Sequence, residues 1–121
     1  MISKRRRVAI IGSTGSIGQQ TLDVIRWLPE RFEVVGLAAG SYSDLFRSQL
    51  DEFKPRLAAV GKDAQTAGIL PPDILRGTRG LTEVATAPEV DLLVVAAAGR
   101  AGLVPTLDAV AVGKTIALAN K

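Results

Sequence analysis

The amino-acid sequence predicts an α/β domain with a doubly wound, mostly parallel sheet and helices on both faces. Two observations support this prediction. Short apolar runs alternate with segments of helical spacing along the whole chain, which is the pattern of repeated βαβ units. Only 4% of the residues are aromatic, so the core must be aliphatic, as is common in a parallel sheet buried on both faces.

The first unit is a strand, a glycine turn and a helix. The apolar run at 8–11 predicts a buried strand. Residues 32–38 predict the second strand. Between them, positions at helical spacing predict a helix that ends before Pro29, and these positions are Ile17, Thr21, Leu22, Ile25 and Leu28.

A second helix is predicted at 44–53, because Ser43 is a suitable N-cap and Pro55 follows the helix. Residues 57–60 predict a short third strand. One side of the helix carries Leu45, Gln49 and Phe53.

The second half continues the alternation with shorter elements. Residues 63–70 and 82–87 predict brief helices, and residues 73–75 predict a minor strand. Residues 91–98 are strongly apolar and predict a buried strand, which a second glycine turn at 99–102 follows.

The last predicted elements are a helix at 103–112 and a strand at 114–119, with Gly113 suited to the position after the helix. Because the chain stops directly after a strand, we expect it to be part of a longer protein. The helix is expected to face the core with Leu103, Leu107 and Val110.

Three glycines at intervals of three follow the first strand. Gly12 allows a positive φ, Gly15 lets a phosphate approach the backbone, and Gly18 lets the helix pack closely on the strand. The helix N-terminus supplies unpaired N–H groups and the positive end of the helix dipole. The turn therefore predicts a nucleotide pyrophosphate site, with a plain structural βα turn as the alternative. Hydroxyl donors and candidate N-caps are Ser13, Thr14 and Ser16.

Composition disfavours several other functions. The chain has no Cys and no His, which excludes disulfides and thiolate zinc sites and removes the usual proton shuttle. Four of the fifteen positive charges lie at 4–7, so residues 1–7 are predicted to be a solvated basic tail before the domain at 8–121. The remaining charges nearly balance, which argues against a nucleic-acid binder. No apolar run is long enough to span a membrane, and no signal peptide is expected.

The turn after the second strand bears on which dinucleotide would bind. NAD sites usually place a carboxylate there, and a carboxylate would repel the 2′-phosphate of NADP. Residues 39–43 contain no Asp or Glu, which favours NADP over NAD, but they contain no Arg or Lys either. Ser41 and Ser43 could donate hydrogen bonds and Tyr42 could stack on adenine.

The remaining chemical candidates are weak, because no two carboxylates have a spacing that suggests a metal site or an acid–base pair. Surface roles are expected for Glu83, Asp91 and Asp108, and also for Arg100, although that side chain could reach a phosphate. Trp27 and Phe32 are expected to pack against the sheet.

Four segments in order resemble one known family over 8–121. They are GSTGSIG with TLDVI at 12–25, LAAG at 37–40, GRAGLVPTL at 99–107, and KTIALANK at 114–121. Together they resemble the N-terminal, Rossmann-like NADPH-binding domain of the 1-deoxy-D-xylulose 5-phosphate reductoisomerase family. The family rearranges 1-deoxy-D-xylulose 5-phosphate and reduces it with NADPH to 2-C-methyl-D-erythritol 4-phosphate, in the non-mevalonate route to isoprenoids.

The resemblance implies a cytoplasmic homodimeric oxidoreductase that needs Mg or Mn. The family's metal ligands lie in a later catalytic domain, so this chain would contain neither metal ligands nor catalytic residues and would be inactive alone. By analogy the cofactor phosphates would lie at Thr14, Gly15, Ser16 and Ile17, the adenosine at Gly40, Ser41 and Tyr42, the nicotinamide near Asn120, and the substrate at Lys121.

Two departures from the family pattern concern the 2′-phosphate. Many members carry Asn where Tyr42 stands, and some carry Lys or Arg where Ser41 stands. Three alternatives remain open: another NADP oxidoreductase, such as a semialdehyde dehydrogenase whose catalytic Cys this chain lacks; a non-catalytic nucleotide-binding module; and a basic nucleic-acid binder.

Overall fold

A computed structural model describes residues 5–61, 71, 73–97 and 100–119. The described residues form one six-stranded sheet in the order β4-β3-β2-β1-β5-β6, and every pair of neighbouring strands is parallel. Four helices complete the fold, and the predicted α/β class is confirmed. The elements are β1 (Arg6–Ile11), α1 (Ser16–Trp27), β2 (Phe32–Ala39), α2 (Asp44–Phe53), β3 (Leu57–Val60), β4 (Leu75–Arg76), α3 (Gly77–Thr86), β5 (Leu92–Val95), α4 (Leu103–Ala111) and β6 (Thr115–Leu118).

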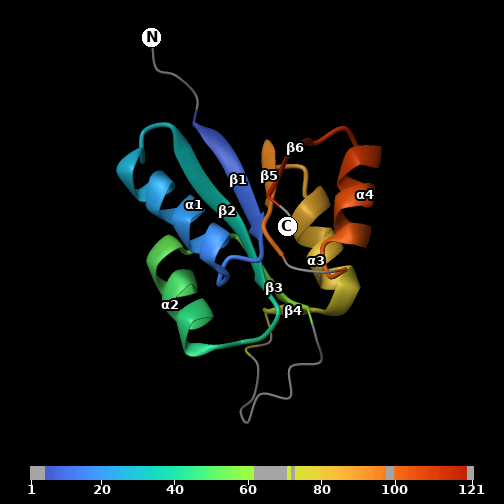
Figure 1. Ribbon diagram of the computed structural model, residues 1–121, viewed down its shortest axis with the longest axis horizontal. Helices are drawn as coiled ribbons and strands as arrows, with labels where there is room; N and C mark the ends of the chain where they lie inside the picture. Colours follow the sequence, from blue (N-terminus) through green and yellow to red (C-terminus); the bar gives the residue numbers. More distant parts are fainter. Residues whose placement is uncertain (1–4, 62–70, 72, 98–99, 120–121) are drawn as a thin grey trace.

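The sheet lies between two helical layers, with α1 and α2 on one face and α3 and α4 on the other (Figure 1). The chain runs outward from β1 to β4, then crosses back over the sheet through α3 to β5 and continues to β6. Right-handed crossovers in these two directions place their helices on opposite faces of the sheet. Alternate residues of the central strands therefore enter two separate aliphatic cores. Ile10 and Leu37 pack with Leu22 and Phe46 under the first layer. Ile11, Val35, Leu93, Val84 and Ala109 pack under the second.

The point at which the strand order reverses lies between β1 and β5. Ile11, the last residue of β1, is in register with Ala38 of β2 and with Val95 of β5. Chain that leaves β1 turns toward β2, whereas the chain that leaves β5 turns toward β6. Parallel sheets open a crevice beyond the strand ends at such a reversal, and ligands bind there.

The first half of the chain agrees with the sequence prediction, and β3 and α2 have the predicted bounds. Ser43 caps α2 as expected, because its hydroxyl accepts a 3.1 Å hydrogen bond from the backbone N–H of Phe46. The start of β1 is a correction. The strand begins at Arg6 and not at Val8, because Arg6 and Arg7 pair with Phe32 and Glu33 of β2. The backbone N–H of Arg7 also donates a 2.9 Å hydrogen bond to the Asp91 carboxylate. Two residues of the predicted tail therefore belong to the sheet.

The predictions for the second half are less accurate. The helix predicted at 82–87 begins five residues earlier, at Gly77, and the minor strand lies at Leu75–Arg76. The short helix predicted at 63–70 falls outside the described residues. The strand predicted at 91–98 is confirmed at Leu92–Val95.

The orientation of α4 differs from the prediction. Its buried residues are Pro105 and Ala109, while the side chains expected to face inward are more than half exposed: Leu103, Leu107 and Val110. The helix lies against α3 at the outer part of the sheet, and the close approach of the two helices uses its small residues. Trp27 is likewise exposed, at 75%, whereas Phe32 packs on the first core as expected.

Polar contacts connect neighbouring elements at a few places. Arg26 of α1 makes a two-pronged ion pair with Glu52 of α2, at 2.6 and 2.7 Å, and also contacts Asp23. The Lys114 ammonium donates to the carbonyls of Ala87 and Val90, which fastens the start of β6 to the loop before β5. Among the described residues no helix is both long and apolar enough to cross a membrane.

Candidate dinucleotide site

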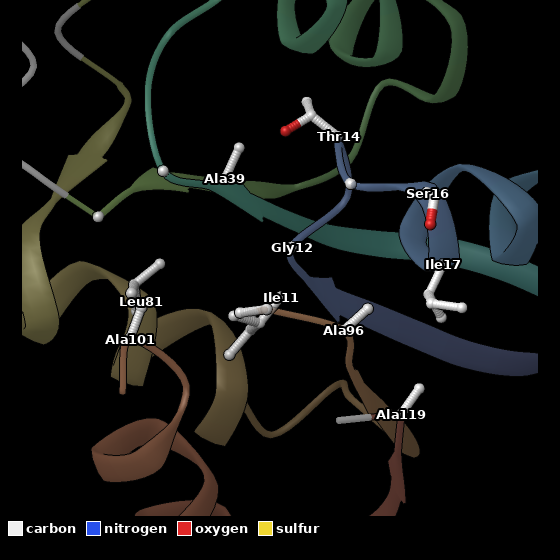
Figure 2. A pocket seen from close by; sticks show the side chains of 14 residues that line it. Ile11, Gly12, Thr14, Ser16, Ile17, Ala39, Leu81, Ala96, Ala101 and Ala119 are labelled. Atoms are coloured by element: carbon white, nitrogen blue, oxygen red, sulfur yellow. The ribbon is translucent and has the colours of Figure 1, made fainter. Parts of the chain in front are cut away.

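A crevice of about 380 Å³ opens beyond the ends of β1, β2 and β5, at the reversal of the strand order. Figure 2 shows the β1–α1 turn on one side of it, with Ala96 and Ala119, which follow β5 and β6, on the other. A cavity of this size is within the usual range for small-molecule sites. The residues that line it are Ile11, Gly12, Thr14, Gly15, Ser16, Ile17, Ala39, Gly40, Gly61, Leu81, Ala96, Ala97, Ala101 and Ala119.

Two glycines of the turn are required by the fold itself. Gly12 has φ +92°, and a Cβ there would lie 2.6 Å from the backbone nitrogen of Ala97. A Cβ on Gly18 would overlap the carbonyl oxygen of Gly12 and lie 2.7 Å from the Cα of Ser13. Both predicted roles, the positive φ at Gly12 and the close helix–strand packing at Gly18, are therefore confirmed.

Gly15 is different, because the protein leaves room for a side chain. Its φ of −75° suits any residue, and a Cβ would lie 3.7 Å from the Gly12 oxygen, at ordinary contact distance. Nothing in the described fold therefore demands glycine at this position. Gly15 lines the crevice, so the absence of a side chain there leaves space for a ligand and is not needed for packing.

The N-terminus of α1 has free donors beside Gly15. The first backbone bond of the helix joins the N–H of Gln19 to the carbonyl of Gly15, at 2.9 Å. Gly15 is the N-cap residue and offers no side chain, so within the described residues the N–H groups of 16–18 have no partner. Unpaired amides and the positive end of the helix dipole together form an anion site.

A hydrogen bond from Gln49 of α2 holds the β1–α1 turn in place. The sequence prediction placed Gln49 on one side of the helix but did not assign it to the site. Gln49 of α2 is 3% exposed, and its side-chain amide donates a 2.9 Å hydrogen bond to the carbonyl of Ser13. The signal in the sequence was a polar residue on the buried side of an amphipathic helix. Ser13 itself is fully buried, so its hydroxyl cannot contact a ligand in the crevice, which corrects the expectation of a donor there.

The structure brings together five of the predicted cofactor residues and leaves others apart. Thr14, Gly15, Ser16, Ile17 and Gly40 all line the crevice, from the ends of two adjacent strands. The predicted residues that follow Gly40 do not line it. Ser41 is exposed, and the ring of Tyr42 packs edge-on against Phe46 with centroids 6.3 Å apart. Asn120 and Lys121 lie outside the described residues.

The crevice is suited to binding and orientation. None of its described lining residues has a titratable side chain, and its only side-chain polar groups are the hydroxyls of Thr14 and Ser16. Within the described part of the chain, no three acidic residues lie close enough to hold a metal ion. Arg100 is exposed next to the lining residue Ala101. The perturbed pKa values lie elsewhere: the hydrogen bond from Arg26 lowers the pKa of Glu52, and the same bond raises the pKa of Arg26.

Comparison with known proteins identifies the family. A family model described as 1-deoxy-D-xylulose 5-phosphate reductoisomerase matches residues 8–121. The chain belongs to the 1-deoxy-D-xylulose 5-phosphate reductoisomerase family. Reductoisomerases of Caldanaerobacter subterraneus and Geotalea uraniireducens are 48% and 47% identical over 96% of this chain. The chain spans about a third of the length of these curated relatives, 31% and 32%.

Solved reductoisomerases share the fold of this chain. A DOX-P reductoisomerase in complex with magnesium gives a TM-score of 0.86 at 38% identity, over 97% of this chain and 31% of that one. A complex with NADPH, fosmidomycin and magnesium gives 0.83 at 39% identity, over 95% and 30%. The Zymomonas mobilis reductoisomerase in complex with NADPH gives 0.82 at 30% identity, over 97% and 32%. The matches do not favour a semialdehyde dehydrogenase or a non-catalytic module.

Proposed function

We propose that this chain is the NADPH-binding domain of a 1-deoxy-D-xylulose 5-phosphate reductoisomerase, and that NADPH occupies the crevice between β1 and β5. The observation that carries the proposal is the uncapped N-terminus of α1 beside Gly15, where the fold leaves an opening that a side chain could have filled. A pyrophosphate is the part of a dinucleotide that such a site recognises, because its negative charge meets several N–H groups at once.

The assignment of the cofactor along the crevice follows from the strand order. The pyrophosphate would contact Thr14, Gly15, Ser16 and Ile17. The adenosine would lie over the ends of β2 and β3, with Gly40 beneath it and Ser41 and Tyr42 at its edge. The nicotinamide would then extend over β5 and β6, toward Ala96 and Ala119, and the resemblance assigns Asn120 to the same end.

For the whole enzyme we propose the family reaction, which is rearrangement of 1-deoxy-D-xylulose 5-phosphate and reduction to 2-C-methyl-D-erythritol 4-phosphate. NADPH supplies the hydride, and residues 8–121 bind and orient it. A homodimer, a cytoplasmic location, a divalent metal held by residues outside this chain, and substrate contact at Lys121 belong to the same proposal. Since the described crevice has no titratable lining residue, this chain alone would bind cofactor without turnover.

Calorimetric titration of the chain with NADPH and with NADH, in parallel, tests the proposal. We expect saturable binding of NADPH, weaker binding of NADH, and no oxidation of NADPH when substrate and Mg²⁺ are added. Absence of binding to either nucleotide would overturn the assignment of the crevice. Detectable conversion of substrate would overturn only the statement that this chain lacks turnover.

A further inference from the structure

The adenosine end of the proposed site should contain a group that binds the 2′-phosphate of NADPH. The 2′-phosphate is the part of NADPH that NADH lacks, and in NADP sites an Arg near the end of the second strand commonly binds it. After Ala39 the chain continues with Gly40, Ser41 and Tyr42, which carry neither the carboxylate of an NAD site nor a cation. Ser41 and Ser43 are the hydroxyl donors of this turn, so a cation for the 2′-phosphate would have to come from a neighbouring element.

The register of the sheet identifies that element. Ala39 at the end of β2 lies beside Val60 of β3, and Val60 lies beside Arg76 of β4. Two strand spacings separate Ala39 from Arg76, which is roughly 10 Å across the sheet. Gly61, the residue after Val60, lines the crevice together with Gly40, so the crevice extends toward Arg76.

Arg76 has the properties of an available cation. Its side chain is exposed, and it has no hydrogen bond or ion pair within the described residues. It is the N-cap residue of the ten-residue helix α3, whose N-terminus no side chain caps, so the helix dipole adds positive potential at the same place. Among the described residues, a Cβ on Gly40 or on Gly77 would meet no atom within 4 Å.

Other described cations near the strand ends are less suitable. Arg47 of α2 pairs with Asp44 at 3.6 Å. Arg100 follows β5 and so lies on the nicotinamide side of the reversal. Arg79 is exposed on α3 and lies three residues beyond the end of β4 in the sequence.

We propose that Arg76 binds the 2′-phosphate of NADPH and is the residue that makes this site prefer NADPH to NADH. The planar guanidinium presents paired N–H donors that match two phosphate oxygens. The inference rests on the proposed function, since it places adenosine over the ends of β2 and β3. It assigns to the end of β4 a role that the turn after β2 has in other dinucleotide-binding proteins.

The test measures NADPH and NADH affinities of this chain and of Arg76→Gln. We expect the variant to bind NADPH tenfold to a hundredfold more weakly, which is the usual effect of losing a charge-assisted hydrogen bond, and NADH unchanged. Added salt should reduce the NADPH preference of the unmodified chain and leave that of the variant nearly constant.

Two variants with the same change of charge serve as controls. Arg79→Gln on the same helix and Lys62→Gln, which follows Gly61 in the sequence, should each change the NADPH-to-NADH preference by less than Arg76→Gln. If either control abolishes the preference while Arg76→Gln retains it, the assignment to Arg76 is wrong. If the unmodified chain binds neither nucleotide, the proposed function itself is wrong. Thermal melts of all variants verify that they are folded.

Discussion

Substitution of Gly15 by alanine separates the needs of the fold from those of the ligand. The new Cβ would lie 3.7 Å from the Gly12 oxygen and 4.0 Å from the Ala96 oxygen, so it creates no clash within the described fold. The backbone is already extended, at φ −75° and ψ 173°. Replacing glycine at such a position restricts the unfolded chain and stabilises the fold by about 0.4–1 kcal/mol.

The effect of Gly15→Ala on binding should have the opposite sign. The added methyl group occupies the space through which a phosphate oxygen approaches the amides of 16–18. Loss of one charge-assisted hydrogen bond costs about 1.5–3 kcal/mol, which corresponds to roughly tenfold to hundredfold weaker NADPH binding. We therefore expect a variant that melts at the same or a higher temperature and binds NADPH poorly.

Gly18→Ala is the matched control. Its Cβ would overlap the Gly12 oxygen, so the helix must move away from the strand, at a cost of about 1–3 kcal/mol in the free energy of unfolding. Urea unfolding and calorimetric titration of both variants measure the two effects separately. Retention of full NADPH affinity by Gly15→Ala would refute the placement of the pyrophosphate at α1.

Three further predictions concern contacts that stabilise the fold. Gln49→Leu leaves the buried Ser13 carbonyl unpaired and should lower the free energy of unfolding by about 1–3 kcal/mol. Gln19→Leu removes an exposed hydrogen bond of the same 2.9 Å length to the Thr14 carbonyl, and it should cost less because water replaces that bond. Equal losses of the two variants in urea unfolding would contradict this prediction. Lys114→Met removes both hydrogen bonds to the loop before β5 and should cost about 1.5–3 kcal/mol in the same assay, with Lys54→Met as the control. Glu52→Gln tests the ion pair with Arg26. The hydrogen bond from Arg26 lowers the folded pKa of Glu52 below its usual value of 4.5, so the pair stabilises the fold above that pH. The contribution disappears as pH falls through the lowered pKa. Both side chains are more than a third exposed, so the difference between wild type and variant should stay below about 1 kcal/mol at neutral pH and vanish in acid; a difference that grows as pH falls would contradict the assignment.

Local signals account for the accuracy of the prediction in the first half of the chain. A capping serine and a following proline bound α2, and the short apolar run at 57–60 lies between Arg56 and Gly61, so the sequence itself marks where both elements begin and end. In α3 the glycines at 77 and 80 obscure the helix, because glycine is a poor helix former. The structure keeps Gly80 because a Cβ there would lie 2.9 Å from Leu75.

The face of α4 that meets the core could not be predicted from spacing. Leucine, valine and alanine occur all around this helix, so hydrophobic periodicity gives no preferred side, and the position of α3 decides which residues are buried. In the site, too, the local features could be predicted from the sequence and the long-range contacts could not. The glycine spacing is local and predicted the turn, but the hydrogen bond from Gln49 to Ser13 joins residues 36 positions apart and depends on the packing of α2 under the turn.

The chemistry of the crevice lining has a consequence for the pH dependence of nucleotide binding. Main-chain amides do not ionise, and the described lining residues add no group that titrates. Cofactor affinity should therefore follow only the ionisation of the nucleotide's own 2′-phosphate, whose second pKa is about 6. Above neutrality the domain would hold its nucleotide equally well at every pH, so the pH optimum of the complete enzyme would be set by groups outside this pocket.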